Sequence, residues 1–180
     1  MMIDYISIIE KYYSTGSDAY NLLITHSRQV AEYAMQLADR SAVAIDRDFA
    51  YEAAMLHDIG VFKTNAPGIF CYGSEPYLRH GLIGKAILEA EGLPRHALVC
   101  ERHIGAGLTA EEITAQHLPL PAIDMLPLTI EEKIVCYADN FFSKSHIAQA
   151  RSYEQVCRQM MRYGAGTMAR LEEMYSLFGE

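Results

Sequence analysis

Apolar residues recur every three to four positions along nearly the whole chain, which is the period of an α-helix. The clearest stripe of this kind holds Leu22, Leu23, His26, Val30, Ala34 and Leu37. No stretch of five or more residues alternates between apolar and polar side chains, as a half-buried strand would require. The pattern therefore predicts an all-α helical bundle, in which each helix turns one apolar face into a shared core.

Residues typical of helix ends divide this pattern into segments. Asp18 is expected to cap the helix that carries the clearest stripe. Thr129 and Glu132 have the spacing of a capping box, in which both side chains bond the backbone at the start of a helix. Pro94 suits the first turn of a helix because its missing N–H group has no partner to lose there. We expect separate helices to begin at these three places.

The chain is expected to form a single domain over residues 1–180, because domains usually hold roughly 100–200 residues. Segments 61–76 and 104–128 contain several Gly and Pro residues and predict two loops, the second of which is expected to shape a pocket mouth. The last helix is expected from about residue 152 to 178, with an interruption at 164–166.

The overall charge is acidic, since 15 Lys and Arg stand against 23 Asp and Glu, a formal net charge of −8. A broad nucleic-acid-binding surface needs clustered basic residues, so we expect no nucleic-acid partner, although a local charge can still hold a small anion. No apolar run approaches the roughly 20 residues of a membrane span, and we expect neither a signal peptide nor a membrane partner. The cysteines form no Cys-x-x-Cys pair, which favours reduced thiols in a cytoplasmic protein: Cys71, Cys100, Cys136 and Cys157.

A histidine and an aspartate stand side by side at the end of an apolar helix, as His57 and Asp58. Such a pair is weak evidence alone, because it arises by chance in many proteins. Two more polar residues, His26 and Asp139, lie on apolar helix faces and are expected to point inward. A buried carboxylate is costly without a partner, and a cation held by all four side chains would supply one. Taken singly, each residue is also compatible with a hydrogen-bonded core histidine or a capping aspartate.

Two further histidines, His80 and His103, stand next to predicted helix ends. Each follows an arginine, Arg79 or Arg102, and each is followed closely by glycine. The remaining histidines match no such pattern and are expected at the surface or at helix ends: His96, His117 and His146.

The order of these residues resembles the HD superfamily of metal-dependent phosphohydrolases, and the segment His57-Asp58-Ile59-Gly60 is the form used by its HDIG subgroup. The resemblance covers about residues 20–145, the expected HD core, which the helix at about 152–178 follows. The stretches 101–107 and 129–139 are also similar to uncharacterised prokaryotic HDIG proteins. The resemblance implies a first metal with four ligands: His26, His57, Asp58 and Asp139. It implies a second metal held by His80 and His103, with Asp58 as the bridge.

The same resemblance implies hydrolysis of a phosphomonoester or phosphoanhydride by a metal-activated hydroxide, and we expect a small nucleotide as the substrate. Asp58, His80 and His103 are the implied catalytic residues. Many HDIG members carry a lysine directly after the glycine, where this chain has Val61. Candidates for binding the remaining phosphate oxygens are Lys63, Arg79 and Arg102. Nitrogen and oxygen ligands without thiolates suit one or two divalent ions of Fe, Mn, Co, Ni or Zn.

Three alternatives stay open. The same ligand set resembles that of di-iron oxygenases within the superfamily, which activate O₂ instead of water. A regulatory module that binds metal or nucleotide without turnover is the second alternative. A homodimer is the third, because four methionines of the last helix suit either a core or a dimer interface: Met160, Met161, Met168 and Met174.

Overall fold

The computed structural model describes residues 3–145 and 149–179. Its α-helices are α1 (Tyr5–Glu10), α2 (Asp18–Arg40), α3 (Arg47–Leu56), α4 (His80–Ala90), α5 (Pro94–Arg102), α6 (Ala110–Ala115), α7 (Ile130–Asp139), α8 (Tyr153–Met160) and α9 (Ala165–Phe178). Short 3₁₀ turns lie at Val61–Lys63, Pro67–Ile69, Tyr77–Arg79 and Met161–Tyr163. The all-α fold predicted from the apolar spacing is confirmed.

One small sheet lies within the loop predicted at 61–76. Strands β1 (Asn65–Ala66) and β2 (Cys71–Tyr72) pair antiparallel, with Asn65 opposite Tyr72 and Ala66 opposite Cys71. Each strand has only two residues, so the alternation that reveals a longer strand has no room to develop. The second predicted loop, 104–128, contains the short helix α6.

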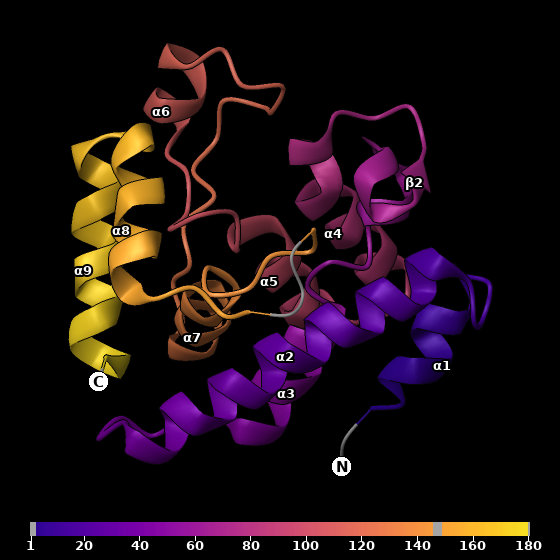
Figure 1. The fold of residues 1–180 in the computed structure, drawn as a ribbon, viewed down its shortest axis with the longest axis horizontal. Coiled ribbons are helices and arrows are strands. Elements are labelled where there is room, and N and C mark those ends of the chain that lie inside the picture. The colour runs from indigo at the N-terminus through magenta and orange to yellow at the C-terminus, as the bar shows by residue number, and fades with distance from the viewer. Residues whose placement is uncertain (1–2, 146–148, 180) are drawn as a thin grey trace.

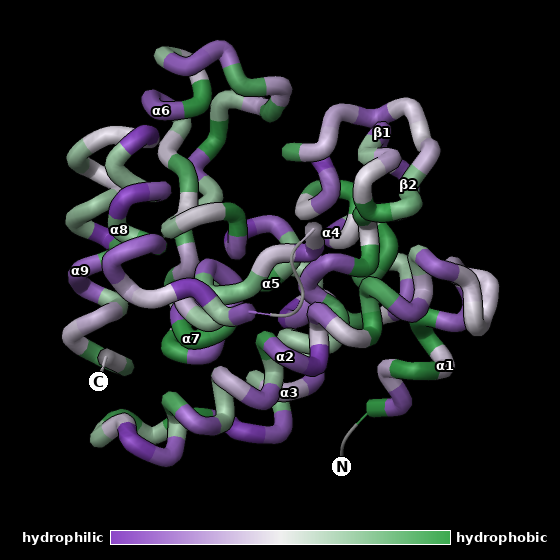
Figure 2. Tube along the Cα trace, viewed as in Figure 1, coloured by the Kyte–Doolittle hydropathy of each residue, from purple (hydrophilic) through white to green (hydrophobic). Residues whose placement is uncertain are grey.

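Helix α2 lies at the centre of the packing. Helices α3 and α7 both pack against α2, α5 contacts α3 and α7, and α4 packs against α5 (Figure 1). Helix α9 packs against α7, and α8 lies beside α9. Figure 2 shows hydrophobic and hydrophilic residues alternating along α2, as expected of a helix with one buried face. Among the described residues, no helix combines the length and the apolar character that crossing a membrane requires.

Two large clusters of buried apolar side chains meet beneath these helices. In α2, Leu23 belongs to one cluster and Val30 to the other, and the fully buried His26 lies between them in sequence. The same boundary falls at the end of α3, where His57 and Asp58 are also fully buried. The fold therefore places these three polar side chains where the two clusters adjoin.

The predicted capping box at α7 forms only in half. The Thr129 side chain accepts a hydrogen bond from the backbone N–H of Glu132, as predicted. The Glu132 carboxylate does not return to Thr129; it accepts hydrogen bonds from Leu128 N and from the Arg102 guanidinium. The backbone N–H of Leu128 and a charged partner from α5 thus take the place of the backbone N–H of Thr129.

The predictions for the start of α2 and for the break in the last helix have different outcomes. Ser17, and not Asp18, caps α2, because its side chain accepts from Tyr20 N while Asp18 is the first helical residue. The last helix is interrupted as expected, but the break lies at the turn Met161–Tyr163 and at Gly164, whereas residues 165 and 166 already belong to α9. Gly164 stands between α8 and α9 with a φ of 102°, which residues with a side chain rarely adopt.

Candidate metal centre

The fold brings all six sequence-predicted ligands together, and most of them stand at helix ends. His26 lies inside α2, whereas His57 caps the C-terminus of α3 and Asp58 follows it. His103 caps the C-terminus of α5, His80 is the first residue of α4, and Asp139 is the last residue of α7. Their assignment as ligands stays a prediction.

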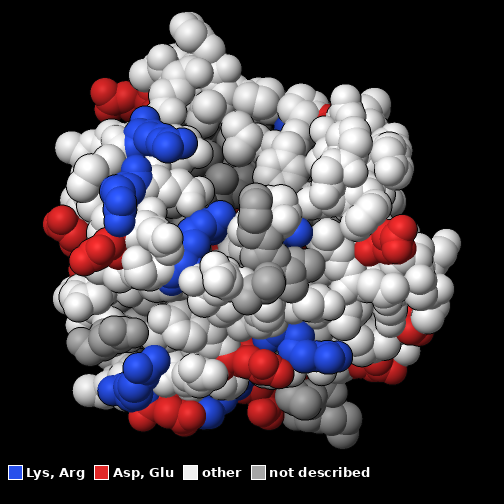
Figure 3. All heavy atoms as spheres, viewed as in Figure 1, with Lys and Arg blue, Asp and Glu red and all other residues white. Residues whose placement is uncertain are grey.

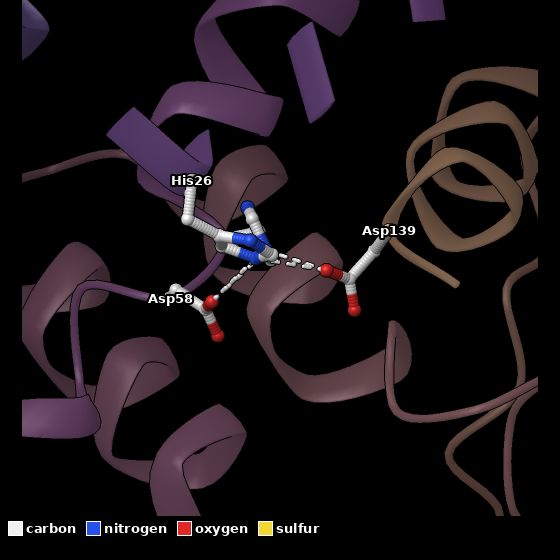
Figure 4. A group of neighbouring side chains, drawn as sticks. His26, Asp58 and Asp139 are labelled. Carbon is white, nitrogen blue, oxygen red and sulfur yellow. Dashed lines mark ion pairs between the residues drawn. The ribbon is translucent and has the colours of Figure 1, made fainter. Parts of the chain in front are cut away.

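The first group of donor atoms gathers around one oxygen of Asp58. Its Oδ2 lies 3.2 Å from Nε2 of His26 and 3.2 Å from Nε2 of His57. Oδ1 of Asp139 lies 3.0 Å and 3.4 Å from the same two nitrogens, as Figure 4 shows for the labelled residues. Although these atoms are so close, none of them makes a hydrogen bond of ordinary geometry to another, and within the described chain an ammonium group lies beside only one of them, Oδ2 of Asp58. Buried donors and acceptors are rarely left in that state, so a shared cation suits the arrangement.

The second group gathers around the other oxygen of the same carboxylate. Oδ1 of Asp58 lies 3.3 Å from Nε2 of His80 and 3.5 Å from Nε2 of His103. The two Nε2 atoms lie 3.0 Å apart. Asp58 therefore faces a separate cluster of donor atoms with each of its oxygens.

Hydrogen bonds to the backbone fix the orientation of three rings. Nδ1 of His57, His80 and His103 donates to the carbonyl oxygen three residues earlier, at 2.6, 2.7 and 2.8 Å respectively. A carbonyl oxygen only accepts, so the hydrogen of each neutral ring must be on Nδ1. Nε2 is then left with a free lone pair, which is the form of imidazole that binds a metal.

The electrostatics of the first group favour positive charge. Burial alone would lower the pKa of His57, but the carboxylates of Asp58 and Asp139 raise it to about 10. Burial would raise the pKa of Asp58, but His57 and Lys144 hold it well below the ordinary value. In the second group, burial lowers the pKa of His80 to about 3 against the opposing effect of Asp58. A metal ion at the first group must therefore displace a proton, whereas His80 is already neutral at pH 7.

Gly60 explains why a glycine follows His57-Asp58-Ile59. A Cβ at this position would lie 2.2 Å from the carbonyl oxygen of His80 and 2.5 Å from the backbone nitrogen of Gly84. The absence of a side chain lets α4 approach the turn after α3 this closely. His80 stands at the start of α4, so this contact helps to bring His80 to Asp58.

Lys144 is a site residue that the sequence reasoning missed. Its Nζ lies 2.6 Å from Oδ2 of Asp58 and its side chain is only 11% exposed. Burial would lower the pKa of Lys144, but Asp58 and Tyr77 raise it above the ordinary value, so the ammonium group stays charged. Lys144 stands five residues after Asp139 and outside α7, where no helical period or motif marks it. Only the folded chain reveals its contact with Asp58.

A family model described as the HD domain matches residues 23–143, which is most of the chain. This chain belongs to the HD-domain family. An HD domain is typically a metal-dependent hydrolase, and the buried His/Asp cluster is of a kind that can bind divalent metals. No solved structure matches the chain.

Three curated proteins are similar to this HD domain. A tRNA (cytidine(56)-2'-O)-methyltransferase of Picrophilus torridus is 40% identical over 133 residues, 73% of this chain and 35% of the relative. An enzyme of the same name from Thermoplasma volcanium is 37% identical over 136 residues, 75% of this chain and 35% of the relative. An uncharacterised protein of Methanocaldococcus jannaschii is 39% identical over 122 residues, 66% of this chain and 64% of the relative. The matches thus span about a third of each methyltransferase and somewhat under two thirds of the third relative.

The donor set of this HD domain fits divalent transition metals. It consists of imidazole nitrogens and carboxylate oxygens, and no thiol belongs to either described group. The nearby thiol of Cys136 is buried and donates to the carbonyl oxygens of His103 and Gly105. When the His80 and His103 rings are both neutral, two acceptor nitrogens face each other at 3.0 Å, an arrangement that a cation relieves.

The basic residues proposed from the sequence as phosphate ligands lie elsewhere. Lys63 is exposed beside the Phe62 ring, and Arg79 is exposed and paired with Glu75 at 3.1 Å. Arg102 is tied to Glu132 at 2.9 Å. None of these three basic residues lines the described cavity at the metal centre. Their role in substrate binding stays a prediction, and the basic residues on the cavity wall are Lys144 and Arg151.

The histidines outside the predicted ligand set have different surroundings. His96 stands in the first turn of α5, a helix-end position as expected, but it is not at the surface: it is 7% exposed and has its Nε2 3.1 Å from the Glu52 carboxylate. An apolar contact with Phe49, at a ring distance of 4.8 Å, completes its burial. His117 is exposed, as expected. His146 lies outside the described residues.

A cavity of about 450 Å³ opens beside the donor atoms. His80, His103 and Asp139 lie on its wall, together with Lys144 and Arg151. Apolar side chains complete the wall, including Tyr77, Leu108, Leu118 and Met160. Ligand pockets typically measure about 300–1,000 Å³, so this HD domain has room for a small organic phosphate next to its candidate metal centre.

Proposed function

We propose that this HD domain is a metal-dependent phosphohydrolase that cleaves a phosphomonoester or phosphoanhydride of a nucleotide-derived substrate. The observation that carries the proposal is the carboxylate of Asp58, whose two oxygens face two clusters of buried nitrogen and oxygen donors. Paired metal sites of this kind are common in enzymes that transfer phosphoryl groups. The names of two relatives refer to an RNA-modifying enzyme, which agrees with a substrate built from nucleotides.

Six side chains would hold the metals: His26, His57, Asp58 and Asp139 at one position, and His80 and His103 with Asp58 at the other. Divalent ions bound there supply an activated water and neutralise charge on phosphoryl oxygens. Lys144 keeps its ammonium group on the cavity wall and can bind an oxygen of an anionic substrate. The apolar wall around Tyr77 and Leu118 provides a surface against which a nucleobase can pack.

A panel of nucleotides and phosphoesters tests this proposal. The full chain, freed of metal and then loaded separately with Mn, Co, Fe or Mg, is assayed for phosphate release with and without oxygen. We expect phosphate release that needs added metal and proceeds without O₂. Oxygen consumption without phosphate release would support the di-iron oxygenase alternative and overturn the proposal.

A pair of variants separates the site from general effects of charge. Asp58→Asn removes the shared carboxylate with almost no change in volume and is expected to abolish phosphate release. Asp18→Asn removes the same charge from the exposed first residue of α2 and is expected to keep wild-type activity. Equal activities of the two variants would show that the Asp58 centre does not carry the reaction.

A further inference from the structure

A cluster of arginines lies on the segment that follows the metal centre. Arg151, Arg158 and Arg162 surround a second cavity of about 360 Å³, which Gln155, Gln159 and Tyr163 also line. This local excess of positive charge contrasts with the net charge of −8 for the whole chain. Figure 3 shows Lys and Arg side chains over α8 and toward the centre of the same face. A concentrated cationic site in an acidic protein points to an anionic ligand.

The two cavities adjoin each other. Arg151, Gln159 and Tyr163 line both the second cavity and the cavity that holds His80, His103 and Asp139. A ligand that extends past these shared residues reaches from the candidate metal centre to the arginine cluster.

The guanidinium groups of the cluster keep hydrogen-bond donors and positive charge that a ligand can use. Arg158 pairs with Glu154 only at 3.8 Å, with both side chains more than two thirds exposed, so this pair contributes little. Arg162 makes no ion pair within residues 3–145 and 149–179. Arg151 is held in place because its Nη1 donates to the carbonyl oxygens of Asn140 and Phe142, both at 3.0 Å. A guanidinium carries five N–H donors, so Arg151 keeps others for a ligand.

We propose that the cluster of Arg151, Arg158 and Arg162 binds a second phosphoryl group of the substrate, beyond the one at the metal centre. Guanidinium groups bind phosphate oxygens through paired, charge-assisted hydrogen bonds, which suits this role. The inference rests on the proposed phosphohydrolase function, because the first phosphoryl group defines where the second one lies. A nucleoside polyphosphate and the 5′-phosphorylated end of an oligonucleotide both present such a group.

Binding and turnover of three ligands test this second site. AMP carries one phosphoryl group, ATP carries three, and a 5′-phosphorylated hexanucleotide adds phosphodiesters. Binding is measured by calorimetry on the metal-loaded full chain with non-hydrolysable phosphonate analogues of the three ligands, so that no ligand is consumed, and KM is measured with the ligands themselves. Arg158→Ala/Arg162→Ala is the test variant. Arg40→Ala/Arg47→Ala removes the same charge from exposed residues of α2 and α3 and is the control.

We expect the test variant to weaken ATP or hexanucleotide binding about tenfold, which corresponds to about 1.4 kcal/mol, because charge-assisted contacts to the phosphoryl oxygens are lost. AMP binding is expected to stay within about twofold, and the control variant should resemble the parent for every ligand. If the hexanucleotide is the ligand affected, the slope of log K against log salt should fall by about 1.4 for two lost contacts. A loss confined to ATP or to the hexanucleotide identifies the source of the second phosphoryl group.

Three results would overturn the inference: unchanged binding of both longer ligands, an equal loss for AMP, or an equal loss in the control variant. Thermal melting of both variants checks that they remain folded. If no ligand is hydrolysed but the selective loss of binding persists, the phosphohydrolase proposal fails while the second anion site stands. If hydrolysis occurs but no ligand shows a selective loss of binding, the second anion site fails while the phosphohydrolase proposal stands.

Discussion

Replacing Gly60 with alanine should damage both the stability and the metal centre. The new Cβ would lie 2.2 Å from the carbonyl oxygen of His80, and Cβ contacts under 3.0 Å essentially do not occur. The turn after α3 and the start of α4 must therefore separate by about 0.8 Å, the difference between these distances. Both partners are backbone atoms of packed segments, so no flexible side chain can absorb the strain.

We expect Gly60→Ala to lower the free energy of unfolding by about 3 kcal/mol, at the upper end of the usual cost of overpacking. Urea denaturation should show this as a fall in the midpoint of about 1–1.5 M. Metal titration should show a larger loss of affinity at the His80–His103 group than at the His26–His57 group, because His80 moves with α4. Gly68→Ala is the matched control, since a Cβ there meets nothing within 4 Å. Equal urea midpoints for the two variants would refute the packing argument.

Three other variants test separate parts of the structure. Asp58→Asn should leave the purified full chain with no tightly bound transition metal, whereas retention of one ion per chain would show that Asp58 is not shared. Lys144→Met removes the ammonium group that lies 2.6 Å from Asp58 and competes with a metal ion for its carboxylate. The apparent affinity for Mn²⁺ should therefore rise about tenfold. Unchanged affinity in calorimetry would contradict this. Burial would raise the pKa of Glu112, but Arg170 holds it below the ordinary value. This pairing therefore stabilises the fold above about pH 4.5 and the stabilisation is lost as the pH falls through the lowered pKa. Chemical denaturation between about pH 5.5 and pH 3 should show a steeper loss of stability for the wild type than for Glu112→Gln.

The helices of this fold were predictable because the apolar spacing that indicates a helix lies within a single segment of the sequence. The apolar stripe that contains Val30 and Leu37 can be recognised from one segment of the sequence. The structure confirms it, because both residues are fully buried in α2. The errors arise where distant residues compete with local ones. Glu132 has the correct spacing for a capping box, yet Arg102 from another helix binds its carboxylate. Sequence spacing within one helix contains no information about that competitor.

The sequence predicted which residues form the candidate site, but not the distances and orientations of their side chains. The order from His26 to Asp139, through its resemblance to the HD superfamily, implied which side chains would meet and that Asp58 would bridge two groups, but not which oxygen of Asp58 faces which group or at what distance. Lys144 was missed because one lysine in a loop has no pattern to distinguish it. The burial of His96 was not predicted because it depends on Glu52 of α3, a partner that is 44 positions away in sequence.

The helix ends connect the stability of this fold to its candidate chemistry. The last carbonyl groups of a helix have no partner within that helix. At the ends of α3 and α5, the imidazoles of His57 and His103 donate to such carbonyls through Nδ1, each at a spacing of three residues. The same bond that satisfies the helix end directs Nε2 toward Asp58 and fixes the tautomer of the neutral ring. A histidine at these positions is therefore both a helix cap and a preorganised ligand. A glutamine side chain could donate to the same carbonyl, but it has no second nitrogen to direct toward a metal.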